Sequence, residues 1–297
     1  MDTKKVMDRR RFFVRGVGMA VAAAAASSAV YAIARKTEES RAEAGTVDAG
    51  LNETLRLQSD LQRALTKPPA ERKWGMVIDV RKCIGCDACT VACIAENNLP
   101  PDVTYRVVKE VEDGDYPALR RYFKPTNCMQ CENPPCMEAA NKLVPGAVTK
   151  RPDGIVEFDY AKLRGDEVVG AAQRACPFTA IYKDNGGNYT DGTPAVQSYE
   201  GREVLEYGQL RSRQETVGVG RKCHFCIQRI EAGILPACVT TCTGQAMYFG
   251  DLNDPDGLVS DLRQRSKSYQ LYASTGIGPK IFYLDNEPQE SCAKCHG

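Results

Sequence analysis

The pattern of hydrophobic and polar positions divides the chain into three parts. Residues 16–34 form a run of small apolar side chains, and residues 35–72 are polar and charged. Within that polar stretch, leucines at 51, 55, 61 and 65 fall at helical spacing, and Pro68-Pro69 follows them. The pattern predicts a polar helical linker over residues 35–72, ended by the two prolines.

The body of the chain, residues 73–285, alternates short apolar segments with turn residues. Residues 76–80 and 281–284 are apolar and rich in β-branched or aromatic side chains, which predicts strands. Residues 148–160 predict a hairpin, because Arg151-Pro152-Asp153-Gly154 supplies its turn. Residues 184–194 and 251–257 are rich in Gly, Asn and Asp and predict loops. Short strands and helices in this order indicate an α+β fold.

The composition and the missing motifs exclude several kinds of functional site. A hydrophobic fraction of 43% can build a core, and a net charge of +1 indicates no nucleic-acid partner. The sequence has no glycine-rich phosphate loop and no dinucleotide fingerprint. With only His224 and His296 as histidines, no Ser/His/Asp catalytic set can be assembled. Fourteen cysteines in 297 residues therefore carry the candidate chemistry.

Residues 1–34 are predicted to be an export signal. Asp8 to Val14 (DRRRFFV) resembles the twin-arginine motif, and small residues end the apolar run at Ala34. We expect a periplasmic protein that meets the inner membrane through partners. The alternative is an uncleaved N-terminal anchor, because nineteen residues could just span a bilayer.

The cysteines of the body fall into motifs. The first run is C-x2-C-x2-C-x3-C, the bacterial ferredoxin spacing, in which three thiolates hold one cubane cluster and the fourth ligates another. A second run is C-x2-C-x4-C, a third is C-x2-C-x11-C-x3-C, and a lone Cys-Pro lies between them. In chain order these motifs comprise Cys83, Cys86, Cys89 and Cys93; Cys128, Cys131 and Cys136; Cys176; and Cys223, Cys226, Cys238 and Cys242.

These motifs resemble a known family. The sequence CMQCENPPC at residues 128–136, Pro236-Ala237-Cys238, and FGDLNDP at residues 249–255 are similar to the four-cluster ferredoxin-like electron-transfer subunits of dimethylsulfoxide-reductase, polysulfide, nitrite and tetrathionate-type membrane complexes. The resemblance covers roughly residues 73–285. It implies tandem bacterial-ferredoxin-like modules with β-hairpin insertions around cubane clusters.

In that family the cysteine motifs pair crosswise. Carried onto this chain, the resemblance implies three [4Fe–4S] clusters, with the following ligand sets: Cys83, Cys86, Cys89 and Cys242; Cys223, Cys226, Cys238 and Cys93; and Cys128, Cys131, Cys136 and Cys176.

The family's fourth cluster is expected to be absent. Counting back from Cys176 by the ferredoxin spacing places three of its ligands at Asp166, Val169 and Ala172, and the fourth would be Ala140. None of these residues is a cysteine. The four positions would supply the ligands of one and the same cluster, so the missing cysteines together indicate the loss of that single cluster.

Zinc and disulfides are the alternatives for the twelve cysteines. Zinc sites usually combine two C-x2-C or C/H elements, and disulfides would not explain ferredoxin spacings. The last two cysteines form a separate motif in residues 286–297: Cys292, Cys295 and His296 make C-x-x-C-H, the attachment sequence for c-type haem. A fortuitous pentapeptide or a tail disulfide is the alternative there.

The chain is thus predicted to be an exported electron-transfer subunit. It would relay electrons between an integral membrane quinone-interacting subunit and a periplasmic redox partner, either a cytochrome c or a molybdopterin-type catalytic subunit, in sulfur-compound respiration or oxidation. The sulfite-reductase-associated membrane complex is one such setting. The alternative is a catalytic iron–sulfur oxidoreductase with its own substrate site.

Other residues near the cysteines are assigned supporting roles. Arg81-Lys82 and Arg221-Lys222 precede two of the C-x2-C loops, where they either raise cluster potentials or lie on the solvated surface. His224 is predicted to pack or to form hydrogen bonds and not to bind metal.

Overall fold

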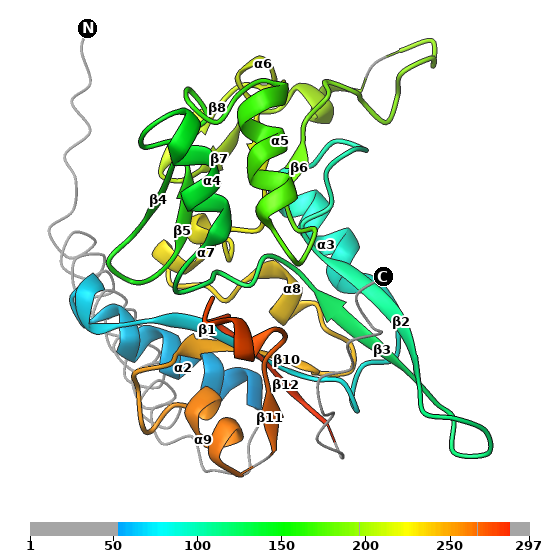
Figure 1. Cartoon of the computed structure of the whole chain (residues 1–297), viewed down its shortest axis with the longest axis vertical. Helices are drawn as coiled ribbons and strands as arrows, with labels where there is room; N and C mark the ends of the chain where they lie inside the picture. Colours follow the sequence, from blue (N-terminus) through cyan, green and yellow to red (C-terminus); the bar gives the residue numbers. More distant parts are fainter. Residues whose placement is uncertain (1–52, 196, 266, 286–297) are drawn as a thin grey trace, which may run out of the picture. The chain divides into compact units, whose positions relative to one another are not determined.

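A four-stranded sheet lies at the base of the described part of the chain (Figure 1). The computed structural model describes residues 53–195, 197–265 and 267–285. Strand β1 (Trp74–Asp79) pairs antiparallel with β10 (Met247–Asp251) and parallel with β12 (Ile281–Leu284), and β11 (Ser268–Tyr269) completes the order β10-β1-β12-β11. Every residue of β1 is buried, so both faces of this sheet are covered. The strands predicted at residues 76–80 and 281–284 are therefore neighbours.

Helix α2 (Glu53–Leu65) belongs to this sheet layer. It packs with α9 (Leu258–Arg265) against β10 (Figure 1). Leu57 and Leu61 are buried in the main core, whereas Leu55 is 53% exposed. The helix was predicted, but its role as a linker is wrong for these residues: its buried face is set by Leu57, Asp60, Leu61 and Ala64.

The remaining elements are short. In the part of the chain that the structure describes, the other α-helices are α3 (Ala88–Asn97), α4 (Pro135–Leu143), α5 (Asp166–Ala175), α6 (Arg213–Thr216), α7 (Ile227–Glu231) and α8 (Ala237–Thr240). Four two-stranded ladders accompany them: β2 (Val107–Asp113) with β3 (Arg120–Thr126), β4 (Val148–Lys150) with β5 (Val156–Phe158), β6 (Tyr182–Lys183) with β9 (Gly220–Arg221), and β7 (Val204–Glu206) with β8 (Gln209–Arg211). The hairpin predicted over residues 148–160 is confirmed in β4 and β5. Helices and hairpins that alternate in this way form the expected α+β fold.

A second, smaller core lies beneath α4 and α5, which pack against each other. Ala140, Val169 and Ala172 are fully buried in it, and these are three of the four positions where the family's additional ligands would stand. The fourth, Asp166, has a side chain that is 90% exposed and pairs with Lys183. Apolar packing thus fills the region in which cysteines would be required.

No helix in the described ranges is both long enough and apolar enough to cross a bilayer. The predicted export signal (1–34) and the haem motif at Cys292, Cys295 and His296 lie outside the described residues.

Candidate metal centres

Twelve cysteines gather around three small cavities, four at each. Site 1 is lined by Cys83, Cys86, Cys89 and Cys242. Site 2 is lined by Cys93, Cys223, Cys226 and Cys238. Site 3 is lined by Cys128, Cys131, Cys136 and Cys176. The structure therefore brings together the members of each set that the sequence analysis groups, and none of these twelve described cysteines is in a disulfide.

Site 1 is the site nearest to solvent, because Cys86 is exposed. Its loop turns at Gly85, which has a φ of +69°, and a Cβ at that position would lie 2.7 Å from the ring of Phe123. Only glycine fits such a left-handed, crowded position without strain. From the other side of the site, Cys242 Sγ accepts the backbone N–H of Ala246 at 3.2 Å.

Site 2 is enclosed, and all four of its cysteines are buried. Several N–H groups point at its sulfurs. The side-chain amide of Asn97 lies 3.6 Å from Cys93 Sγ, that of Asn127 lies 3.5 Å from Cys223 Sγ, and the backbone N–H of Phe225 also donates to Cys223 Sγ at 3.5 Å. Donors of this kind stabilise negative charge on sulfur.

Two short helices connect Sites 1 and 2. Helix α3 presents Cys89 to Site 1 and, one turn later, Cys93 to Site 2. Helix α8, which packs on α3, presents Cys238 to Site 2, and the chain continues to Cys242 in Site 1. In both segments, therefore, two cysteines four residues apart serve two neighbouring sites, which is the spacing of about one helical turn.

Site 3 is joined to Site 2 by buried polar side chains. Gln130, which lies within the C-x2-C loop and is fully buried, donates to the Cys223 carbonyl at 2.6 Å and accepts the Val156 N–H at 2.8 Å. Lys222 Nζ donates to the Val156 carbonyl at 2.6 Å and to the Cys223 carbonyl at 3.2 Å. Val156 lines the Site 3 cavity, so Site 2 has direct structural links to both of the other sites.

Burial controls the acidity of the cysteines. It raises the pKa of Cys89 and Cys223 to about 11 and that of Cys136 to about 12. Buried thiols of this kind are poor nucleophiles at neutral pH, and they become thiolates when they bind a metal. The arrangement suits metal ligation better than nucleophilic catalysis.

The paired cations that precede the C-x2-C loops differ in environment. Arg81 and Lys82 are partly exposed and form ion pairs with Asp79 and Glu53. Arg221 and Lys222, in contrast, are 1% and 0% exposed, so the alternative that placed them on the solvated surface is wrong. Lys222 is buried between Sites 2 and 3, where it bonds to the carbonyls of Cys223 and Val156, and Arg221 is buried in an ion network with Glu206 and Asp184.

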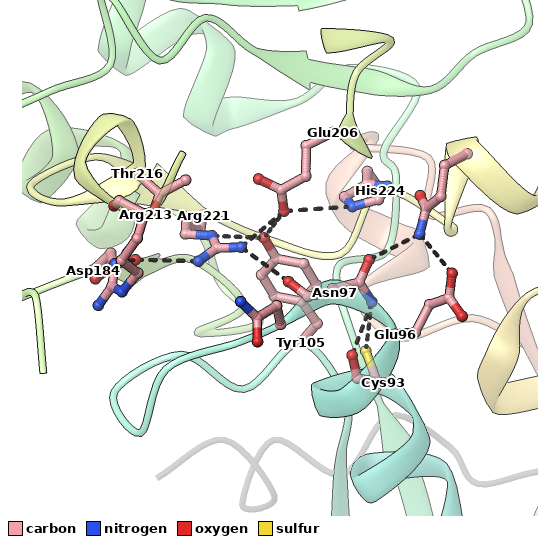
Figure 2. Close-up of polar contacts among 12 residues, drawn as sticks. Cys93, Glu96, Asn97, Tyr105, Asp184, Glu206, Arg213, Thr216, Arg221 and His224 are labelled. Atoms are coloured by element: carbon pink, nitrogen blue, oxygen red, sulfur yellow. Dashed lines mark hydrogen bonds and ion pairs between the residues drawn. The ribbon is translucent and has the colours of Figure 1, made fainter. Parts of the chain in front are cut away.

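Arg221 is part of a buried ion network (Figure 2). Its guanidinium donates to Glu206 Oε1 at 3.0 Å and to Asp184 Oδ2 at 3.1 Å, and Arg213 also pairs with Asp184 at 2.8 Å. Tyr105 donates its hydroxyl to Glu206 Oε1 at 2.9 Å. Arg221 and His224 hold the pKa of Glu206 well below its ordinary value, although burial alone would raise it.

His224 lies at the edge of this network, and its predicted packing and hydrogen bonding are confirmed. It is buried, it contacts the rings of Tyr105 and Tyr207, and its Nδ1 accepts the backbone N–H of Ile227 at 3.2 Å. Its Nε2 is 3.7 Å from Glu206 Oε1 (Figure 2). His224 therefore packs and orients neighbouring groups.

Arg106 is a functional residue that the cysteine motifs do not point to. This residue is 2% exposed, lines the Site 2 cavity, and donates from Nη2 to Cys238 Sγ at 3.4 Å and to Met76 Sδ at 3.5 Å. No cysteine lies near it in the sequence. Asn97, Asn127 and Gln130 were missed as well, although their positions close to cysteines in the chain were a usable signal.

Across the described ranges, no three His, Cys, Asp or Glu side chains are grouped as they would be around a single metal ion. The donor sets at the three sites consist of four cysteines each, with N–H groups directed at the sulfurs. All-cysteine sets with N–H donors fit a [4Fe–4S] cluster.

Comparisons with known proteins point to the same chemistry. A family model described as the 4Fe-4S dicluster domain matches residues 119–195 and 189–252, which contain all of Site 3 and all of Site 2 except Cys93. The chain is 45% identical over 236 residues to one of the subunits of the selenate reductase of Mesobacillus selenatarsenatis, a match that spans 77% of this chain and 78% of the relative.

Two further relatives are more distant. The arsenate respiratory reductase iron–sulfur subunit of Shewanella sp. strain ANA-3 is 30% identical over 234 residues, which cover 71% of this chain and 95% of the relative. One of the subunits of the tetrathionate reductase of Salmonella typhimurium is 30% identical over 218 residues, which cover 71% of this chain and 72% of the relative.

Proposed function

Because the chain belongs to the family of iron–sulfur subunits of multi-subunit reductases, we propose that it is an electron-transfer subunit with three [4Fe–4S] clusters. The observation that carries this proposal is the grouping of twelve cysteines into three cavities with four cysteines each. A [4Fe–4S] cluster takes up and releases single electrons at a potential set by its surroundings. We assign one cluster to each of Sites 1, 2 and 3, with the four cysteines of each site as its ligands.

The chain's own residues hold and insulate these sites. Asn97, Asn127 and backbone N–H groups donate to the sulfurs, which stabilises the negative charge that thiolates bring into the interior. Helix α3 and Gln130 tie Site 2 to its two neighbours and so hold the three sites at constant separations. Fixed separation and low exposure suit a relay, in which the protein must move little when charge moves.

The count of three rests on the packing beneath α4 and α5. Ala140, Val169 and Ala172 occupy an apolar core, and no sulfur ligand is present where the family's fourth cluster would bind. We propose that this site is lost and that Site 3 is the end of the relay on that side.

We further propose that the chain is exported by the twin-arginine route and acts in the periplasm at the inner membrane. The DRRRFFV motif at residues 8–14 supports export of a protein that has already folded around its clusters. Its partners would be an integral membrane quinone-interacting subunit and either a cytochrome c or a molybdopterin-type catalytic subunit. The selenate, arsenate and tetrathionate reductases among the relatives favour reduction of an oxyanion or a sulfur compound by the complex.

We also propose that Cys292 and Cys295 bind haem c covalently, with His296 as an axial ligand. A haem on the C-terminal tail would suit a cytochrome as the redox partner.

Metal analysis of the anaerobically purified full chain tests the cluster count. We expect roughly twelve irons per chain, four for each site, and low-temperature resonance signals from reduced cubanes. Zinc in place of iron would contradict the proposal. Turnover of a substrate by the isolated chain would favour the catalytic alternative.

Two measurements address the termini. A reduced pyridine haemochrome spectrum should reveal haem c in protein from a host competent in haem maturation, and its absence there would remove the haem from the proposal. Mass spectrometry of the mature protein should show cleavage after Ala34, and an intact N-terminus would favour the membrane anchor.

A further inference from the structure

Arg106 brings a positive charge into the most enclosed of the three sites. It directly precedes β2, is 2% exposed, and lines the Site 2 cavity together with Cys93, Cys223 and Cys238. Only Nη2 has polar neighbours, and both are sulfurs: Cys238 Sγ at 3.4 Å and Met76 Sδ at 3.5 Å. Nε and Nη1 are buried without a hydrogen-bond partner.

The charge of Arg106 is not neutralised by the described residues. None of their carboxylates forms an ion pair with it, whereas Arg221 is paired with Glu206 and Asp184. A buried, unpaired charge with orphaned donors is strongly destabilising. The cavity into which Arg106 faces is therefore built for an anionic occupant.

A guanidinium stays protonated in proteins, so Arg106 carries its positive charge into the interior.

We propose that Arg106 is the counter-ion of the Site 2 cluster and raises its reduction potential through the hydrogen bond to Cys238. The inference rests on the proposed function, because it requires a cluster at Site 2. On reduction, one electron passes to this centre from its redox partner, which is oxidised; no bond forms or breaks and no proton is transferred. The added negative charge strengthens the attraction between the cluster and Arg106, so Arg106 stabilises the reduced state more than the oxidised state.

The test is a mediated redox titration of the anaerobic full-length holoprotein, followed by low-temperature resonance. Arg106→Gln removes the charge, and Arg106→Lys keeps it. Arg72→Gln is the matched control, because Arg72 is also a buried arginine but bonds only to backbone carbonyls and lines none of the three sites. Cys238→Ser identifies the resonance signal of Site 2.

We expect Arg106→Gln to lower the reduced-to-oxidised ratio of the Site 2 centre at least ten-fold at a fixed ambient potential, which is a shift of about 59 mV. A charge-assisted hydrogen bond of ordinary strength is large enough for such a change. Arg106→Lys should stay within a few-fold of the wild type, and Arg72→Gln should leave all potentials in place.

The outcomes separate the two proposals. A wild-type protein without iron would overturn the proposed function. Full iron with an unmoved Site 2 potential in Arg106→Gln would overturn the role of Arg106. If Arg106→Gln fails to assemble the centre, Arg106→Lys provides the test. Wild-type iron content and a wild-type Site 2 potential in this variant would support the proposal that the positive charge raises the potential. A ten-fold change in the reduced-to-oxidised ratio, although the charge is retained, would contradict that proposal.

Discussion

Replacing Glu206 by glutamine unbalances the buried ion network of Figure 2. Glu206 and Asp184 supply two negative charges, and Arg221 and Arg213 supply two positive charges. Glu206 and Arg221 are each 1% exposed, so water cannot compensate for a missing charge. Glu206→Gln has nearly the same shape but leaves the interior with one excess positive charge.

The size of the effect follows from the distance and the burial. At 3.0 Å, and with an effective dielectric constant of about 20, the Coulomb attraction between Glu206 and Arg221 is about 5.5 kcal/mol. Glutamine can still accept hydrogen bonds from Arg221 and Tyr105, which reduces the loss. Removal of one partner from a buried pair costs about 3–5 kcal/mol. For a domain of this size, that cost corresponds to a decrease in Tm of roughly 6–20 °C.

Thermal unfolding of the anaerobic holoprotein measures this change. Iron–sulfur proteins unfold irreversibly, so all variants are compared at one scan rate, with far-UV circular dichroism and visible absorbance recorded together. Glu138→Gln is the matched control, because Glu138 makes an exposed i,i+4 pair with Lys142. It should leave the Tm unchanged, because an ion pair in water contributes little to stability.

The pH dependence has a definite sign. The pKa of Glu206 is lowered from an ordinary value of 4.5, so its stabilisation is fully present above pH 4.5 and is lost as the pH falls toward the folded-state value. The difference in Tm between wild type and Glu206→Gln should therefore be constant from about pH 6 to 8 and should narrow only below pH 4.5.

A double-mutant cycle can refute the reasoning. Glu206→Gln combined with Arg221→Met restores neutrality, so the double variant should lose clearly less stability than the two single variants together. Losses that add to within about 0.5 kcal/mol would show that the two residues do not act as a pair. A decrease in Tm of less than about 2 °C for Glu206→Gln would show that the charge balance does not matter.

Three further changes test other parts of the structure. Leu57→Ala should lower the free energy of unfolding by about 2–5 kcal/mol, because the Leu57 side chain is buried in the core. Leu55→Ala should change it by no more than about 0.5 kcal/mol, because Leu55 is exposed. Equal effects would show that α2 is a linker and not part of the core. Gly85→Ala should lose about one third of the bound iron through clash and strain in the Site 1 loop, while Gly192→Ala, with a positive φ but open surroundings, should keep its iron. Lys222→Met removes a buried positive charge beside Site 3 and should lower the Site 3 reduction potential by on the order of 50 mV in a redox titration. An unchanged potential would show that the charge of Lys222 does not affect Site 3.

Local signals predicted much of the fold. The strands at 76–80 and 281–284, the hairpin at 148–160 and the helix ahead of Pro68 all form, because apolar periodicity and turn residues act over a few positions. The parallel pairing of β1 with β12 and the docking of α2 on β10 could not be predicted in this way. Both join segments about two hundred residues apart, and the local sequence of a segment does not specify which distant segment it will contact.

The sequence by itself determined which cysteines are candidate ligands, because cluster spacing is a short-range property that one loop or one helical turn can meet. How they group was implied by the family resemblance, because each set joins cysteines from distant segments. Only the tertiary structure decided the charge around them. Arg81-Lys82 and Arg221-Lys222 have the same local sequence, yet the first pair is partly exposed and ion-paired, while the second is buried, with Arg221 in an ion network and Lys222 between Sites 2 and 3. Arg106 reaches Site 2 from a segment without cysteines. Burial and charge pairing depend on which distant segments meet. The charges that surround each site are therefore brought together only when the protein folds.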